Sequence, residues 1–172
     1  PQRGRRRGGR RGPPGDPASS PDENVVGRQL KPADVASYKD RGLFDPDVVR
    51  TFFIDFPIGE GPQLDEQWIE ELTAFYRTDV KVPARVTVDG VSYANVGVSF
   101  RGNTSFSRVR GKKKSFDLEF DFVDPKQDIA GTRNLDLLNC NGDASFMREA
   151  LHGWVANHFL PAPRVALVHV VC

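Results

Sequence analysis

Apolar and polar residues alternate along several short stretches of the chain, a pattern typical of half-buried strands. The first stretch is residues 51–56, where Phe52, Ile54 and Phe56 fall on one face of an extended backbone. Alternation of this kind directs every second side chain to the same side of a sheet. We therefore predict a first core strand at residues 51–56.

Two further alternating runs lie close together in the sequence. Residues 82–88 and 91–100 are separated only by Asp89-Gly90. This dipeptide suits the positive φ angles of a tight turn, so the two runs predict a β-hairpin. Residues 101–111 are polar and punctuated by glycine, and we expect a loop there.

Residues 114–122 alternate again, which predicts a strand with one buried and one acidic face. The buried face would carry Phe116, Leu118, Phe120 and Phe122. The outer face would carry Asp117, Glu119 and Asp121. Lys113 has the phase of the outer face, where it can pair with Asp117 or Glu119, whereas Lys114 has the phase of the buried face.

Two segments show helical spacing of apolar residues instead. Residues 64–77 predict a helix with Asp65 as its N-cap, and its core side would carry Trp68, Leu72, Phe75 and Tyr76. A second helix would begin at the N-cap Asp143 and end before Pro161. Its buried stripe would consist of Phe146, Met147, Ala150, Leu151, Trp154, Val155, His158 and Phe159. We expect His152 and His158 to be packing residues, since neither has an acidic or cysteine partner at metal-site spacing.

Two short apolar runs, residues 135–138 and 164–171, complete the set of predicted strands. The order is strand, helix, several antiparallel strands, helix and strand. This order indicates an α+β fold in which helices pack on a mainly antiparallel sheet.

Composition divides the chain of 172 residues into two parts. Residues 1–24 consist mainly of Arg, Gly, Pro and Ser and offer little to bury, so we expect a disordered linker before a domain at residues 25–172. The net charge is +1, but residues 1–12 contain six Arg and no acid, which leaves −5 for the rest. A mildly acidic folded part argues against specific nucleic-acid binding.

Neither the cysteines nor the hydropathy points to a particular compartment. Cys140 and Cys172 allow at most one disulfide, far below the density of a small crosslinked scaffold. No run approaches the roughly 18 apolar residues of a membrane-spanning helix, and no signal peptide is recognisable. The chain starts at Pro1 and stops at Cys172 within an apolar run, so we expect both ends to be cut.

Lys114 is the first candidate for binding chemistry, because an ammonium on the buried face of a strand needs an anionic partner. By sequence logic the best internal carboxylate is Glu149, in the first turns of the second helix. The alternative is a bound phosphate, which Arg101 and the backbone of the following loop could help to hold. A strand lysine paired with a helix glutamate near a glycine-containing loop is how protein kinases hold ATP phosphates.

The order of several short blocks along the chain resembles the CotH (spore coat protein H) kinase family. The blocks are Val96-Gly97-Val98-Ser99-Phe100-Arg101-Gly102-Asn103-Thr104-Ser105, Lys113-Lys114-Ser115-Phe116, Asp128-Ile129-Ala130-Gly131, Leu135-Asp136-Leu137-Leu138-Asn139, Asp143-Ala144-Ser145-Phe146-Met147-Arg148-Glu149 and Pro161-Ala162-Pro163-Arg164. The match covers roughly residues 45–171, and the order of the blocks is more specific than any one of them.

The resemblance implies an atypical protein kinase that uses ATP with Mg or Mn to phosphorylate serines of coat or surface proteins. It implies a kinase-like fold and a location outside the cell, in the envelope or in the spore coat. It makes Lys114 the phosphate-contacting residue, Glu149 its helical partner and Arg101 a loop contact. In the family the metal-binding and catalytic aspartates lie beyond the last strand found here, so the resemblance implies an incomplete, catalytically inactive fragment.

Two other functions stay open at the level of sequence. The chain can belong to a non-catalytic coat or cell-surface protein with a structural or adhesive role, as CotH-like proteins of some fungi do. An RNA-associated protein would need only the Arg/Gly-rich residues 1–12.

Overall fold

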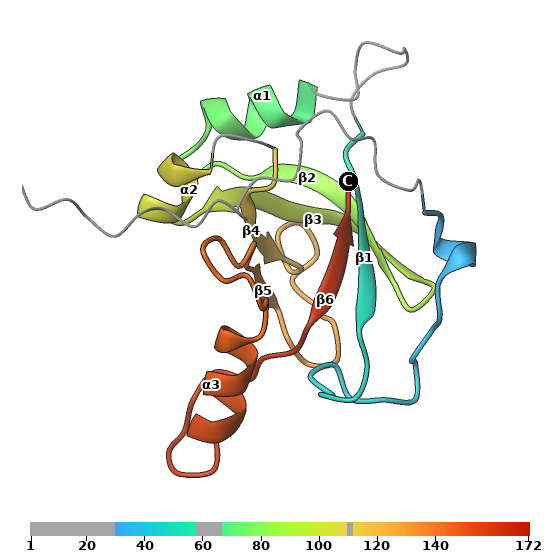
Figure 1. The fold of residues 1–172 in the computed structure, drawn as a ribbon. Helices are drawn as coiled ribbons and strands as arrows, with labels where there is room; N and C mark the ends of the chain where they lie inside the picture. The colour runs from blue at the N-terminus through green and yellow to red at the C-terminus, as the bar shows by residue number, and fades with distance from the viewer. Residues whose placement is uncertain (1–29, 58–66, 110–111) are drawn as a thin grey trace, which may run out of the picture.

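The computed structural model describes residues 30–57, 67–109 and 112–172, which form one curled sheet with helices at its margins (Figure 1). The predicted linker at residues 1–24 and the predicted N-cap Asp65 lie outside the described residues.

The described strands form a six-stranded sheet in the order β5-β4-β3-β2-β1-β6. Its strands are β1 (Arg50–Asp55), β2 (Val82–Val88), β3 (Val91–Arg101), β4 (Ser115–Glu119), β5 (Asn134–Leu137) and β6 (Val168–Val171). The pairs from β1 through β5 are antiparallel, whereas β6 pairs parallel with β1. The predicted α+β architecture with a mainly antiparallel sheet is therefore confirmed.

The hairpin between β2 and β3 has the turn that its sequence predicts. Asp89 and Gly90 adopt φ angles of 51° and 72°, both in the left-handed region. Two consecutive residues with positive φ give a backbone twist that matches the twist of the flanking strands. The register that follows pairs Val88 with Val91 and, beyond a bulge, Val82 with Val98.

Phe116, Leu118 and Phe120 all lie in the core, as predicted, with 5% or less of their surface exposed. Phe122 does not: it lies beyond the end of β4 and is 38% exposed. Its ring covers Gly97 on β3, where a Cβ would come within 2.7 Å of it. The alternation continues in the sequence past the point at which the strand ends, so the phase prediction fails at Phe122.

Helix α1 (Gln67–Ala74) packs on the sheet through its apolar side. Leu72 is 2% exposed, and Trp68 stacks on Phe56 with ring centroids 4.9 Å apart. Phe75 and Tyr76 also pack against the core cluster. The predicted core side of this helix is confirmed.

Helix α3 (Arg148–Ala156) projects from the sheet beyond β5 and does not bury its predicted stripe (Figure 1). Leu151, Val155 and Phe159 are 50%, 59% and 82% exposed. The buried residues of this helix are the small ones, Ala150 and Gly153. The prediction of a buried apolar stripe is therefore wrong, because the side of α3 that packs carries small residues and the half-buried Trp154, while Leu151 and Val155 point outward.

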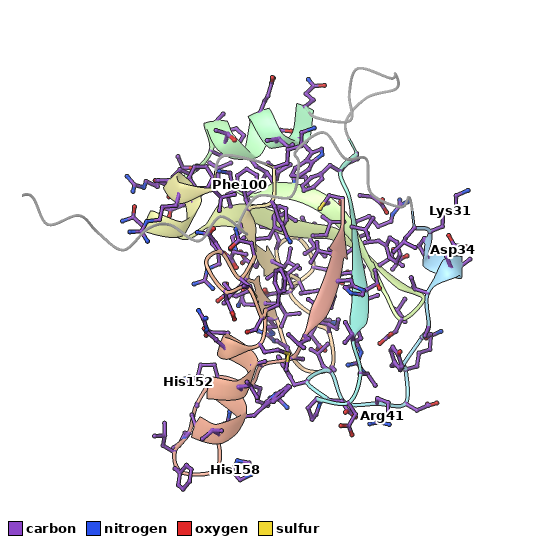
Figure 2. All side chains as sticks on the ribbon, viewed as in Figure 1. Lys31, Asp34, Arg41, Phe100, His152 and His158 are labelled. Carbon is purple, nitrogen blue, oxygen red and sulfur yellow. The ribbon has the colours of Figure 1, made fainter. Side chains whose placement is uncertain are left out.

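The segment after α3 returns along the helix, so the last strand is shorter than predicted and begins at Val168. Trp154 Nε1 donates to the Val165 carbonyl at 3.1 Å. A Cβ on Gly153 would lie only 2.4 Å from Val165 Cγ2, so the close approach requires glycine. Figure 2 shows His152 and His158 on this projecting segment, far from Phe100, and both are exposed, which corrects their prediction as packing residues.

Asp143 is not the N-cap of α3, which begins at Arg148 after two turns. Its carboxylate nevertheless accepts hydrogen bonds from the Ser145 and Arg148 backbone N–H groups at 3.0 and 2.8 Å. Asp143 therefore fixes the turn that leads into the helix.

Candidate functional site

Lys114 immediately precedes β4 and is partly buried. Its Nζ donates to the Phe106 carbonyl at 3.0 Å and to the Val109 carbonyl, and it lies 4.5 Å from the centroid of the Phe106 ring. The two carbonyls belong to the end of a short helix, α2 (Thr104–Arg108), and to the residue after it. Carbonyl groups at the C-terminal end of a helix attract a cation. The structure thus holds the Lys114 ammonium inside the segment that connects β3 to β4.

The sequence predicted a loop at residues 101–111, but α2 occupies part of it. Phe106 anchors this helix: its ring stacks on Tyr76 with centroids 3.7 Å apart and tilts against Phe100 at 5.6 Å. The Tyr76 hydroxyl donates to the Gly102 carbonyl at 2.5 Å. A single aromatic residue within a polar segment was the only signal of this contact, and it has no periodicity from which a helix could be predicted.

Arg101 is the last residue of β3 and lies opposite Ser115, next to Lys114 in sequence. Directly paired residues share a face, so Arg101 lies on the side of Ser115 and Asp117, opposite the buried side of Phe116. Its guanidinium pairs with the Asp136 carboxylate of β5, and both side chains are exposed. The structure brings Arg101 and Lys114 to neighbouring strand ends but not to the same face of the sheet.

Glu149 lies in the first turn of α3 and is exposed. The ion pairs between described residues do not include one that joins Glu149 to Lys114. The prediction of this partner assumed that the helix packs on the sheet, whereas α3 projects from it.

Cys140 lies before the start of α3. The pKa of its thiol is raised first by burial and then by Asp143, and Glu149 adds a smaller effect. A thiol with a raised pKa stays protonated, and a protonated thiol is a poor nucleophile and metal ligand.

The acidic face of β4 is neutralised by Lys81 and not by Lys113. Lys81 Nζ lies 2.9 Å from both the Asp117 and the Glu119 carboxylates. Burial opposes its charge, but the hydrogen bonds to the two carboxylates outweigh burial and raise the pKa of Lys81. The Lys113 ammonium lies 5.0 Å from the Phe146 ring centroid instead. No pattern in the sequence indicates Lys81, which precedes a strand that is not a neighbour of β4.

The described residues contain no group of three or more His, Cys, Asp or Glu side chains that could hold a metal ion. They therefore do not provide a protein ligand set for the Mg or Mn that the resemblance implies. None of the helices in the described ranges is long and apolar enough to cross a membrane.

Comparison with known proteins adds no relative to this picture. A scan against protein-family models and a search of curated proteins both gave no match to the chain.

Proposed function

We propose that this chain is the nucleotide-binding portion of an ATP-dependent protein kinase of the CotH type, with Lys114 as the residue that contacts the ATP phosphates. The proposal rests on the ordered blocks in the sequence. One observation in the structure supports it: the Lys114 ammonium is drawn into the segment between β3 and β4 and held there by backbone carbonyls. Arg101 lies at the adjacent strand end and would reach a bound nucleotide only around the ends of the strands.

The chemistry of these contacts suits phosphate binding. A carbonyl oxygen is neutral, so the bonds from Phe106 and Val109 position the ammonium without removing its charge. Phe106 limits the access of water on one side, which strengthens an ionic hydrogen bond to phosphate. In protein kinases a lysine on a strand contacts the nucleotide phosphates. We assign no protein ligand to the divalent metal and derive no role for it from this chain.

ATP binding by the chain tests the proposal directly. We expect saturable binding of a fluorescent ATP analogue in the presence of Mg, measured by anisotropy. Lys114→Met keeps the aliphatic stem and removes the charge, so affinity should fall about tenfold or more. Lys113→Met is the matched control, because Lys113 contacts Phe146 instead, and its affinity should be unchanged. Circular dichroism would check that both variants fold.

Two results would contradict the proposal: no saturable binding by the wild-type chain, or equal affinity for Lys114→Met and wild type. Either result would favour the second candidate function, a non-catalytic coat or cell-surface protein. The exposed side chains of Leu151, Val155 and Phe159 favour that candidate, because apolar residues gathered on a surface often mark a contact with another protein.

A further inference from the structure

A cavity of about 220 Å³ lies at the end of β3 opposite Lys114. It is formed by the segment that precedes β1, by the β2–β3 turn and by residues 129–130. Leu43, Val88 and Ile129 form an apolar part of its wall, and Val88 and Ile129 are almost fully buried. Val91 and Ala130 also line the cavity, and the remaining lining residues are four charged side chains and one tyrosine. A concave apolar site with a few polar groups is the usual form of a small-molecule site.

Arg50 and Asp89 neutralise one another on one side of the cavity. Arg50 Nε lies 2.7 Å from the Asp89 carboxylate, and both side chains are nearly buried. The same guanidinium donates to the carbonyls of Leu43, Tyr38 and Arg41 at 3.0, 3.2 and 2.8 Å. Four hydrogen bonds therefore use four of its five N–H groups. Arg50 builds the wall of the cavity and fixes the chain before β1 against the hairpin turn.

Arg41, at the lower right in Figure 2, also has acidic partners. Its guanidinium lies 2.6 Å from the Asp45 carboxylate and 3.3 Å from that of Asp47. Two of the three cations that line the cavity thus have acidic partners. The remaining cation is Lys39.

The Lys39 side chain is exposed and lies over the hairpin turn, since a Cβ on Gly90 would be 3.7 Å from its Nζ. Its ammonium makes no ion pair or hydrogen bond with any part of the chain that the structure describes. Lys39 therefore brings to the cavity a positive charge that the other lining residues do not offset.

Tyr93 provides a second polar group on the wall. Its ring is held edge-on against Phe120, with centroids 5.2 Å apart. Burial, followed by the charges of Asp128 and Asp89, raises the pKa of its hydroxyl. The phenol thus stays protonated near neutral pH and can donate a hydrogen bond.

We propose that this cavity binds a carboxylate carried on a short apolar group. Lys39 would be the ionic contact and Tyr93 a hydrogen-bond donor. The hydrocarbon part would lie among Leu43, Val88 and Ile129.

A carboxylate with one negative charge fits the cavity better than a phosphate. The cavity offers one cation without an acidic partner, while the nearby Asp128 carboxylate repels a dianion more strongly than a monoanion. The proposal is independent of ATP binding, which would occur at the other end of β3.

The test is a titration of the isotope-labelled chain with sodium isobutyrate, followed by amide NMR shifts. The shifts should saturate and should centre on Lys39, Gly90 and Ala130. Isobutyramide, which has the same shape without the charge, and inorganic phosphate should each bind at least about tenfold more weakly, because neither matches one ammonium beside an apolar wall.

Variants identify the contacts. Lys39→Met should weaken isobutyrate binding about tenfold, while Lys31→Met, a matched exposed lysine outside the cavity, should not change it. Tyr93→Phe should weaken binding by a smaller factor. Unsaturable shifts with isobutyrate, equal affinity for isobutyramide or phosphate, or unchanged affinity in Lys39→Met would each overturn the proposal. The amide spectrum of each variant reports in the same experiment whether it is folded.

Discussion

Helices α1 and α3 have similar amphipathic sequences but opposite relations to the sheet. In α1 the large residues face inward, and Trp68 and Leu72 pack into the core cluster. In α3 the large residues Leu151 and Val155 face outward, and Gly153 makes the close contact with Val165. Helical periodicity therefore predicts which residues share an apolar face. Whether that face is buried depends on the segments that the rest of the chain packs against it. Three experiments can break or sharpen this comparison.

The largest effect is expected in α1. Leu72→Ala should lower the free energy of unfolding by about 2–5 kcal/mol, because it removes a side chain that is 2% exposed and leaves a cavity. The matched control in α3 is Leu151→Ala, because Leu151 is 50% exposed. This variant should change the free energy of unfolding by about 0.5 kcal/mol or less. Urea unfolding would measure both. Similar losses for the two variants would mean that α3 packs as tightly as α1.

A smaller effect is expected at the tight contact within the α3 region. Gly153→Ala places a methyl group 2.4 Å from Val165 Cγ2 and should cost about 1–3 kcal/mol through overpacking. In a Val165→Ala background the same change should be neutral or stabilising, because alanine favours the helix over glycine by about 1 kcal/mol. A double-mutant cycle by thermal unfolding measures the coupling. Additive effects would show that the two residues do not touch.

The smallest effect is a local response of α3 to acid. The Ser145 hydroxyl, followed by the Arg148 backbone N–H, donates to the Asp143 carboxylate and lowers its pKa below the ordinary 3.8. A carboxyl group with a lowered folded pKa stabilises the native state above its unfolded pKa, and this contribution is lost as pH falls through the folded value. The amide protection factors of α3 should therefore fall relative to those of α1 below about pH 3.8.

Asp143→Asn provides the control for this response, since asparagine can accept hydrogen bonds in the turn but does not titrate. In this variant the ratio of α3 to α1 protection should be independent of pH over the same range. An unchanged ratio in the wild-type chain would show that Asp143 does not support the start of α3.

The sequence predicted the elements that depend on local patterns. The hairpin followed from Asp89-Gly90, the core face of β4 from Phe116 and Leu118, and the packing side of α1 from Trp68 and Leu72. These predictions succeeded because turn chemistry and side-chain periodicity act over a few residues.

Several failures concern contacts that tertiary structure brings about. Lys81 reaches the acidic side of β4, and Arg50 pairs with Asp89, but nothing in the sequence near either residue indicates its partner. At the candidate site, periodicity placed Lys114 in the phase of the buried face but did not reveal that α2 would supply carbonyls to its ammonium. Glu149 was chosen on the assumption that α3 packs on the sheet, a property of tertiary structure that its own periodicity does not encode.

The position of β6 beside β1 has a consequence for the kinetics of folding. Strands β2 and β3 are joined by a two-residue turn, whereas the pairing of Phe52 with Val170 connects residues from distant parts of the sequence. Closing so long a loop costs more chain entropy than closing the hairpin, so the β1–β6 ladder should form after the antiparallel strands. Interactions that form late contribute mainly to the barrier against unfolding. The parallel strand β6 should therefore lengthen the lifetime of the native state without accelerating its formation.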